Sequence, residues 1–556
     1  MQAQRNKQAR GAFYLLWLAL SLVQAYGSNL IPDEAYYWRY SRDLAWGYFD
    51  HPPVIALLIR AGDVLWHSEV GVRLASILLT MGTIFLTERL TRPRDAALYY
   101  LAVSSVAVLH IAGILAVPDI PLLFFTAAFF YLYRQYCERE RWYHIFLLAG
   151  NVALLLLSKY HGILVVGFTL LSHPRLLRRP SLWAIATLGA ALFLPHVLWQ
   201  HMHGYPSVLY HLSGRNATPY NVSFTLSYLG VVPLLFAPAT GIVLLYLALK
   251  RKATDTTERA MRVTLWGTLL FFLAMSFRGR IEGNWILFLV IPVLALGYKE
   301  LEQRQWSGKF IRISFLFTSV LVMAGRILLL DGVAPFRNDC SGWKDWAAAV
   351  HHEAKGETVA FMNSYQKAAE YEFYTGGSAF SLNNIMGRKD QYGLWNTENN
   401  AQGKTVLLIC NYPVHDSLGQ LATRRDTPQY LHIRDFRSSS RIYIELTELK
   451  DDRSIGAGDT LDVGYSIGLE EGATLPGADN PDYPMRLTYQ FTGEDGQVTS
   501  TATDELLTAQ QIIKGSHLHV PVPAPAHAGR YYLSLSVRTG WLPPSINGGK
   551  KRVTVR

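Results

Sequence analysis

The first 330 residues of this 556-residue chain are a series of apolar blocks separated by short polar segments. Most blocks are about 20 residues long, the length that a helix needs to cross the hydrocarbon layer of a bilayer. No such block follows Asp331, although 50% of all residues in the chain are hydrophobic. We therefore predict a mainly α-helical, polytopic membrane bundle of about eleven helices over residues 1–330, followed by a part outside the bilayer.

The expected membrane helices are Gly11–Leu30, Glu69–Leu90, Ala96–Leu115, Ile120–Tyr136, Tyr143–Ser158, Gly162–Ser172, Ser181–Gln200, Ser223–Leu249, Met261–Phe277, Asn284–Tyr298 and Phe310–Leu330.

Basic residues are concentrated in alternate connections between these helices. The rich connections are expected to carry only basic residues and helix caps, and they include Arg10, Arg89, Arg134, Arg175, Arg251 and Lys299. The other connections hold far fewer, namely Arg39, Arg42, Arg60, Lys159, Arg215, Arg278 and Arg280. Positive-inside bias places the N-terminus in the cytoplasm and everything beyond Leu330 outside. The net charge of +10 then reflects the basic residues of the connections on the cytoplasmic side, and no nucleic-acid partner is expected. No cleavable signal is expected, because the first block lacks a small-residue cleavage site.

The first external loop is the most distinctive polar stretch. It contains Pro32-Asp33-Glu34-Ala35-Tyr36-Tyr37-Trp38 and Gly47-Tyr48-Phe49-Asp50-His51-Pro52-Pro53. Proline beside Asp at a first turn is a helix-start signal, so two short helices are predicted, with aromatic rings at the headgroup level. Asp33 and Glu34 are interpreted as functional carboxylates rather than as caps alone, because two adjacent charges at a membrane surface are costly.

The predicted topology places every other polar motif of the membrane half on the same outer side. These motifs are Pro118-Asp119-Ile120-Pro121, Ser158-Lys159-Tyr160-His161-Gly162, the segment with His196, His201 and His203, and Arg278-Gly279-Arg280-Ile281-Glu282-Gly283-Asn284-Trp285. Taken singly, an aspartate placed like Asp119 is more often a helix cap, and a lysine placed like Lys159 more often extends its ammonium to the membrane interface. Arg280 and Glu282 could simply pair with each other at the surface. Their occurrence on one face suits a reaction between a lipid-borne anionic donor and a hydroxyl acceptor. The histidines lack fixed zinc spacing, so a divalent metal ion is left open.

The part beyond Leu330 is expected to form two modules. Residues 331–437 predict an external α/β module, with helices near Trp343–Lys355 and Gln366–Tyr374 and strands Thr358–Met362 and Thr405–Cys410. Residues 438–556 predict a β-sandwich from strands separated by Gly, Asp and Pro turns. Those strands are Ile442–Leu446, Thr460–Ile467, Met485–Phe491, His517–Val522, Tyr531–Val537 and Arg552–Val555. Cys137 is expected to be reduced, whereas Cys340 and Cys410 could pair only outside the cytoplasm.

The motifs of the membrane half resemble those of a known family. The first-loop motif, Pro118-Asp119-Ile120-Pro121, Ser158-Lys159-Tyr160 and Gly283-Asn284-Trp285 are similar to motifs of bacterial glycosyltransferases related to protein O-mannosyltransferases and to the lipid A aminoarabinose transferase. Asn363-Ser364-Tyr365-Gln366-Lys367 and Gly387-Arg388-Lys389-Asp390-Gln391-Tyr392 are also similar to the bacterial branch, so the resemblance covers residues 1 to about 412.

The resemblance implies a GT-C membrane enzyme of the bacterial inner (plasma) membrane that uses a polyprenyl-phosphate-linked sugar donor, with a lipid, glycan or protein as acceptor. It implies Asp33 as catalytic base, Glu34 beside it, Asp119 as a second essential acid, and an inverting transfer. The donor phosphate is assigned to Lys159, Tyr160, His161, Arg278 and Arg280. Tyr37, Asp50, His51, Glu282, Asn284 and Trp285 are assigned to acceptor or loop positioning. His161 and Ile286 depart from the family pattern, which bears on donor or acceptor identity.

Two alternatives to a glycosyltransferase are considered. A lipid-linked sugar transporter or flippase would also be polytopic, but it should place ionisable groups at mid-bilayer and show related halves. A phosphoryl transferase should carry a nucleophile and metal ligands in the external part, where His and Asp lack ligand spacing. No glycine-rich phosphate loop follows a strand in the membrane half, so no nucleotide sugar is expected.

Overall fold

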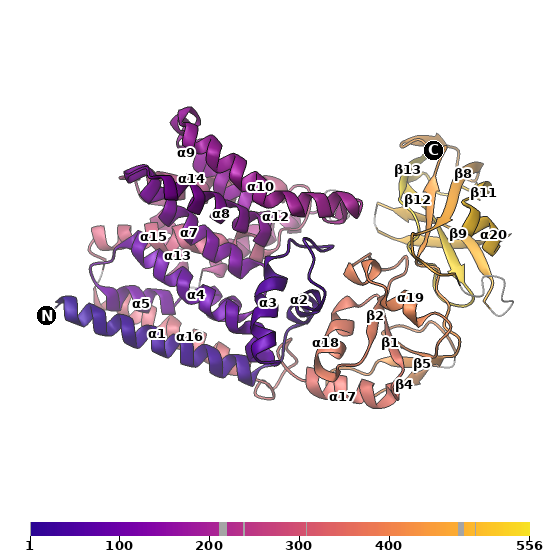
Figure 1. The fold of residues 1–556 in the computed structure, drawn as a ribbon, viewed down its shortest axis with the longest axis horizontal. Helices are drawn as coiled ribbons and strands as arrows, with labels where there is room; N and C mark the ends of the chain where they lie inside the picture. Colours follow the sequence, from indigo (N-terminus) through magenta and orange to yellow (C-terminus); the bar gives the residue numbers. More distant parts are fainter. Residues whose placement is uncertain are drawn as a thin grey trace. The chain divides into compact units, whose positions relative to one another are not determined.

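A computed structural model describes the chain except for residues 1, 211–219, 237–239, 307, 417, 476–482 and 495. It divides into two compact units, one that ends at Ser341 and one from Gly342 to Arg556 (Figure 1). We call them the membrane unit and the C-terminal unit. Cys137, Cys340 and Cys410 are all free thiols.

All regular secondary structure among the described residues of the membrane unit is helical. Its principal helices are α1 (Gln2–Gly27), α2 (Pro32–Arg42), α3 (Val54–Leu65), α4 (Glu69–Thr91), α5 (Ala96–Ser104), α6 (Ala107–Ile111), α7 (Asp119–Glu138), α8 (Trp142–Ser158), α9 (Gly162–Ser172), α10 (Pro180–Met202), α12 (Val222–Leu235), α13 (Thr240–Lys250), α14 (Thr256–Met275), α15 (Val290–Gln303) and α16 (Lys309–Leu328). The short helices are the 3₁₀ segments η1 (Ala112–Ile114), η2 (Pro174–Arg178) and η4 (Gly283–Leu289), together with α11 (Pro206–Leu209). Helix α4 packs against α1, α3, α7 and α15, and the largest apolar core of the unit lies around these helices.

Each predicted apolar block coincides with a helix or a pair of helices, but two blocks are interrupted. Ala96–Leu115 is not one straight span, because α5 ends at Ser104 and the following helical segment is bent by 76°. Ser223–Leu249 is divided into α12 and α13, and the connection between them lies outside the described residues. Four described helical segments are long and apolar enough to cross a membrane, and seven result if each of three bent pairs counts as one. The expected number of eleven crossings stays a prediction.

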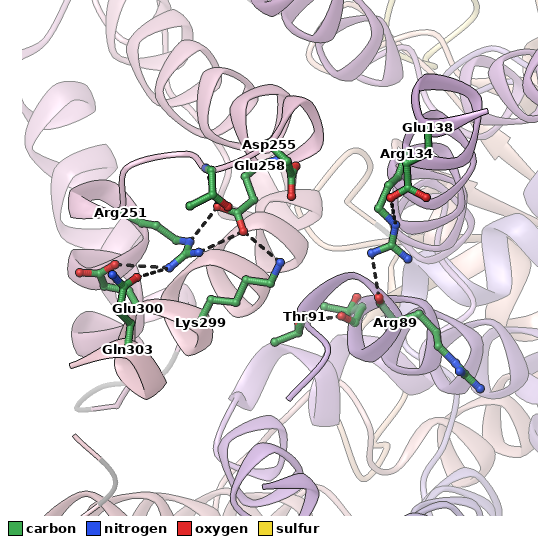
Figure 2. Close-up of polar contacts among 12 residues, drawn as sticks. Arg89, Thr91, Arg134, Glu138, Arg251, Asp255, Glu258, Lys299, Glu300 and Gln303 are labelled. Carbon is green, nitrogen blue, oxygen red and sulfur yellow. Dashed lines mark hydrogen bonds and ion pairs between the residues drawn. The ribbon is translucent and has the colours of Figure 1, made fainter. Parts of the chain in front are cut away.

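The basic connections contain buried acidic partners that the sequence interpretation did not expect. Figure 2 shows Arg251 between α13 and α14, where its guanidinium donates to both oxygens of Glu258 at 3.0 Å. Lys299 Nζ binds Glu258 at 3.0 Å, and Arg251 Nη1 also reaches Glu300 at 3.5 Å and Gln303 at 3.2 Å. In the same figure, Arg134 on α7 donates to the carbonyl oxygen of Arg89 at 3.0 Å. The expectation of basic residues and caps alone was therefore wrong, because burial of Arg251 requires a counter-charge.

The C-terminal unit begins with an α/β layer. Its sheet has the order β2-β1-β3-β5-β4, in which β1 (Thr358–Met362) is parallel to both β2 (Ala379–Leu382) and β3 (Val406–Cys410). Strand β5 (Gln429–Ile433) pairs antiparallel with β3, and β4 (Gly419–Gln420) pairs antiparallel with β5. The helices of this layer are α17 (Trp343–Ala354), α18 (Tyr365–Thr375), η5 (Gln391–Leu394) and α19 (Thr397–Ala401), and α18 packs on β1 and β2 (Figure 1).

Two further sheets follow around one apolar core. A five-stranded sheet has the order β10-β9-β12-β13-β7, and a three-stranded sheet has the order β11-β8-β6. Their strands are β6 (Ile442–Leu446), β7 (Arg453–Ile455), β8 (Thr460–Leu469), β9 (Met485–Gly493), β10 (Val498–Leu506), β11 (His517–Pro523), β12 (Gly529–Thr539) and β13 (Lys551–Val555), with helix α20 (Ala509–Lys514). Ile444 and Val463 of one sheet and Leu487 and Leu535 of the other belong to the same buried cluster. Six of these strands lie where the sequence predicts strands.

Candidate active site

The first-loop motif forms two short helices, as the two proline signals predict. Helix α2 has Pro32 in its first turn, with Asp33 and Glu34 as its first acidic residues. Helix α3 follows Pro52 and Pro53. Asp33 is half-buried on α2, whereas the Glu34 carboxylate is fully buried.

The aromatic residues of this loop are inside the unit rather than at its surface. Tyr36, Tyr37 and Trp38 are buried, as are Tyr40 and Tyr48, whose rings stack at 4.1 Å. Their arrangement has a polar cause, because the buried Asp50 carboxylate accepts hydrogen bonds from Tyr36 Oη at 3.1 Å and Tyr40 Oη at 3.4 Å. These rings therefore pack against protein, and their expected depth at the headgroup level stays a prediction. Of the loop aromatics, Trp46 is the strongly exposed one.

Glu34 is held by a buried arginine that the sequence interpretation missed. Arg73 on α4 donates to both Glu34 oxygens, at 2.8 Å and 2.6 Å, and is itself 1% exposed. The same carboxylate accepts from the backbone N–H groups of Ile31 at 3.0 Å and Ala116 at 2.8 Å. A lone arginine four residues into an apolar span was the signal available in the sequence. Glu34 thus joins the first loop to α4 and to the segment before Asp119.

Three motif segments that are far apart in the sequence meet at Asp119. Lys159, just after α8, donates to Asp119 Oδ1 at 2.7 Å, and both side chains are about 5% exposed. Asn284 of η4 donates to Asp119 Oδ2 at 3.4 Å. We call these three residues the Asp119 cluster. Asp119 makes no side-chain cap, and Lys159 is buried instead of reaching toward an interface, so neither of the simpler interpretations fits.

The ammonium of Lys159 is incompletely used by this cluster. It carries three N–H donors, and among the described residues Asp119 is its one hydrogen-bond acceptor. Two donors are therefore available to another oxygen. The neighbouring His161 ring lies 5.5 Å from the Trp285 ring and 5.6 Å from the Phe272 ring.

The first loop is fastened to the segment that follows Lys159. Tyr160 Oη lies 3.0 Å from His196 Nε2, and His196 Nδ1 lies 2.7 Å from the carbonyl oxygen of Trp46. A side chain at Gly47 would meet the Trp199 ring at 2.4 Å, so this close approach requires glycine. The Tyr37 and His51 rings lie 5.4 Å apart within the loop.

The remaining predicted site residues are more exposed. Arg280 lies 3.6 Å from Glu282, with side chains 71% and 41% exposed, and Arg278 is exposed on the same connection. His201 Nδ1 pairs with Tyr205 Oη and His203 Nδ1 with the carbonyl oxygen of Trp199, so neither joins His196. Across the described ranges, no group of three or more His, Cys, Asp or Glu side chains is placed to hold a metal ion.

Comparisons with known proteins show which proteins this chain resembles. Residues 50–199 match the family model described as dolichyl-phosphate-mannose-protein mannosyltransferase. The fold is similar to two crystal structures of ArnT from Cupriavidus metallidurans, one in the apo state and one bound to undecaprenyl phosphate. The TM-scores are 0.56 and 0.55 at 14% identity, over 75% of this chain and 97% of ArnT. Together these matches support a membrane glycosyltransferase of the GT-C type.

A relative in sequence points to the same class. Lipid A galacturonosyltransferase RgtD from Rhizobium johnstonii is 26% identical over 207 residues. That match spans 34% of this chain and 42% of RgtD, less than half of the relative's length.

Proposed function

We propose that the chain moves a sugar from a polyprenyl-phosphate-linked donor to a lipid, glycan or protein acceptor at the outer face of a bacterial inner membrane. The observation that carries this proposal is the Asp119 cluster, because it brings three motif segments together around the buried Asp119–Lys159 ion pair. The ArnT structure bound to undecaprenyl phosphate supports a polyprenyl phosphate as the lipid carrier.

Asp33 is the proposed catalytic base. Its carboxylate would take the proton of the acceptor hydroxyl while the acceptor oxygen bonds to the anomeric carbon. The bond from that carbon to the phosphate oxygen breaks on the opposite side, its electron pair stays on the polyprenyl phosphate, and the configuration inverts. Asp33 suits this role because it is half-buried on a helix whose next residue, Glu34, is fixed by Arg73.

Glu34 is proposed to position Asp33 instead of reacting itself. Its two oxygens accept four hydrogen bonds, from Arg73 and from the Ile31 and Ala116 backbone. These four hydrogen bonds occupy the lone pairs of the Glu34 carboxylate, so none is left for the acceptor hydroxyl. Glu34 therefore fixes α2 relative to the Asp119 segment.

The departing phosphate is proposed to be stabilised by Lys159, with Arg278 and Arg280 at the entrance and Tyr160 and His161 beside it. The two remaining Lys159 donors can bind phosphate oxygens, and Asp119 holds the ammonium in place. Tyr37, Asp50, His51, Glu282, Asn284 and Trp285 are proposed to shape the loops that receive the acceptor. The proposed orientation has the N-terminus in the cytoplasm and the C-terminal unit outside.

A purified, reconstituted protein tests the proposal with polyprenyl-phosphate sugars extracted from the source membranes. A transferase releases free polyprenyl phosphate and adds a sugar to an acceptor, both visible by mass spectrometry. A flippase, the alternative function, moves the donor across the bilayer with its sugar–phosphate bond intact. If the donor crosses the bilayer and no polyprenyl phosphate is released, the protein is a transporter and the proposed transfer is wrong.

Asp33→Asn is the sharpest variant for this assay. Asparagine keeps the size of the side chain and caps helices about as well as aspartate, yet it cannot accept a proton near neutral pH. We expect turnover to fall about 10²–10⁴-fold with unchanged thermal stability. Glu34→Gln is the matched comparison, and it should destabilise the protein because Arg73 loses its charge partner. Near-normal turnover in Asp33→Asn would exclude the base assignment.

A further inference from the structure

Two motifs of the C-terminal unit that the proposed reaction does not use meet in space. Asn363 follows β1 and begins one motif, and Gly387 begins the other after β2. A Cβ atom at Gly387 would lie 2.1 Å from Asn363 Oδ1, so the two segments touch only because Gly387 has no side chain. Asn363 itself has a φ of 53°, a left-handed conformation that a few polar residues tolerate.

Their meeting point is the edge where α/β sheets bind ligands. Strands β2, β1 and β3 are parallel in that spatial order, so the chain leaves β1 toward one side and returns on the other as β3. Ligands bind outside the carboxyl ends of strands at such a switch point. Asn363, Asn384 and Tyr412 follow the carboxyl ends of β1, β2 and β3 in turn.

The hydrogen bonds at this edge fix the direction of one hydroxyl group. Asn363 Oδ1 accepts the backbone N–H of Asn384, and Asn384 Oδ1 accepts that of Met386, both at 2.9 Å. These bonds determine which way each amide is turned. Both Nδ2 atoms then donate to Tyr412 Oη at 2.9 Å, and Asn363 Nδ2 also donates to Asn384 Oδ1 at 2.9 Å. Two donors occupy both lone pairs of Tyr412 Oη, so its own proton points to another acceptor.

A small pocket beside the amides offers a second, independent signal. Its lining includes Asn383, Asn384, Ser438, Ser439 and Thr539. Thr539 is 4% exposed, and its Oγ1 has no hydrogen-bond partner within the described parts of the chain. A buried hydroxyl without a partner is costly, so this atom is suited to a ligand hydroxyl.

The groups that donate to Tyr412 Oη and those that line the pocket are neutral, which selects the ligand. The second motif adds charges beside them, namely Arg388, which lies over the Tyr365 ring, and Asp390, which accepts from Asn383 Nδ2. Lys367 is the nearest ammonium on α18, and its charge is taken by Asp426 at 2.7 Å while Asn411 accepts a further bond at 2.9 Å. The array therefore presents amides and hydroxyls, together with the Tyr412 ring, which is 36% exposed. This combination matches the hydroxyl groups and apolar ring faces of a sugar better than an anion.

We infer that the edge formed by Asn363, Asn384, Tyr412 and Thr539 is a binding site for a neutral saccharide. The site is independent of the transfer reaction, since none of these residues belongs to the Asp119 cluster or to the first loop.

An array of immobilised neutral oligosaccharides of glucose, galactose, mannose and N-acetylglucosamine tests this inference with the full-length protein in detergent. We expect at least one oligosaccharide to bind the wild type, and Tyr412→Phe to weaken its binding about tenfold, because the ligand loses the hydroxyl donor. Tyr443→Phe removes a hydroxyl from another exposed tyrosine, 43% exposed, and should leave binding unchanged. Asp33→Asn should also bind normally, which separates this site from the catalytic proposal.

Three results would overturn the inference. They are binding of no oligosaccharide, equal binding by wild type and Tyr412→Phe, and displacement of a bound oligosaccharide by inorganic phosphate at low millimolar concentration, which would make the site anionic. Should Tyr412→Phe unfold, Thr539→Val removes the pocket hydroxyl while keeping its shape, and equal binding by that variant would count against the site.

Discussion

Two polar clusters lie at opposite ends of the segment formed by η4 and α15, and they are built differently. At the end of α15, Arg251 is bound by Glu258, Glu300 and Gln303, and Glu258 also binds Lys299. We call these five residues the Arg251 network. At the beginning of η4, the Asp119 cluster leaves two Lys159 donors without acceptors among the described residues.

This difference distinguishes a cluster with a structural role from one that can bind a substrate. The Arg251 guanidinium uses four of its five N–H donors within the network, so it joins helices together and has little left for a ligand. A buried charge with donors to spare costs stability, and such sites persist where a substrate supplies the missing partner. The Arg251 network is thus a structural joint between α13, α14 and α15, and the Asp119 cluster is the candidate site.

The largest expected effect comes from removing charges in the Asp119 cluster. Lys159→Met and Asp119→Asn each leave one buried charge unpaired, so each should lower the free energy of unfolding by about 3–5 kcal/mol. The double variant should regain most of that stability, because neither charge remains. Turnover should stay about 10²–10³-fold below wild type in all three variants if Lys159 stabilises the departing phosphate.

Thermal unfolding and donor cleavage measured on the same preparations check this cycle. Lys309→Met, which neutralises an exposed lysine, is the control for loss of a positive charge. Wild-type turnover in the stable double variant would reduce the cluster to a structural joint like the Arg251 network.

The sequence could predict the pieces of the candidate site but not their assembly. Helix α2, helix α7 and the strand Thr358–Met362 follow from local signals such as Pro32, Pro118 and a continuous apolar run. The contact between Asp119 and Lys159 joins residues 40 positions apart, and no local pattern encodes it. The contact between Glu34 and Arg73 is equally non-local.

The missed strands have a different cause. Strand β10 reads Val-Thr-Ser-Thr-Ala-Thr-Asp-Glu-Leu and lies at the edge of its sheet with most residues exposed, so it has no apolar periodicity to detect. Strand β2 has four buried residues only, too few to distinguish a strand from a buried turn. Edge position and short length hide a strand from pattern-based prediction.

The second effect concerns the Arg251 network and should be on stability alone. Arg251→Met leaves Glu258 buried with Lys299 as its one remaining charge partner, and we expect the free energy of unfolding to fall by about 3–5 kcal/mol. Turnover per folded molecule should stay at the wild-type level. Lys252→Met changes an exposed neighbour and should alter neither quantity. A loss of turnover in folded Arg251→Met protein would erase the distinction between the two clusters.

The smallest effect is expected in a third cluster, which lies in the C-terminal unit and is partly solvated. His432 on β5 has its Nδ1 atom 2.6 Å from Glu357 and its Nε2 atom 3.1 Å from Glu353. Burial alone would lower the pKa of His432, but the hydrogen bonds to Glu353 and Glu357 outweigh it and raise the pKa above the ordinary 6.5. The hydrogen bond to His432 in turn lowers the pKa of Glu353 below 4.5.

The sign of the pH dependence follows from these two shifts. The His432 contribution to stability is complete below pH 6.5 and is lost as the pH rises through the raised pKa, whereas the Glu353 contribution is complete above pH 4.5 and is lost as the pH falls. Hydrogen exchange in α17 and β5, corrected for the intrinsic rate, should therefore show protection decreasing about two- to fivefold between pH 6 and pH 9, a modest change because the pair is partly exposed. His432→Gln should show little of this decrease, and His519→Gln, at an exposed histidine that also pairs with two acids, should retain all of it. If protection in the wild type does not change with pH, solvent screens this cluster completely. Burial would then be the property that distinguishes the two clusters of the membrane unit from the His432 cluster.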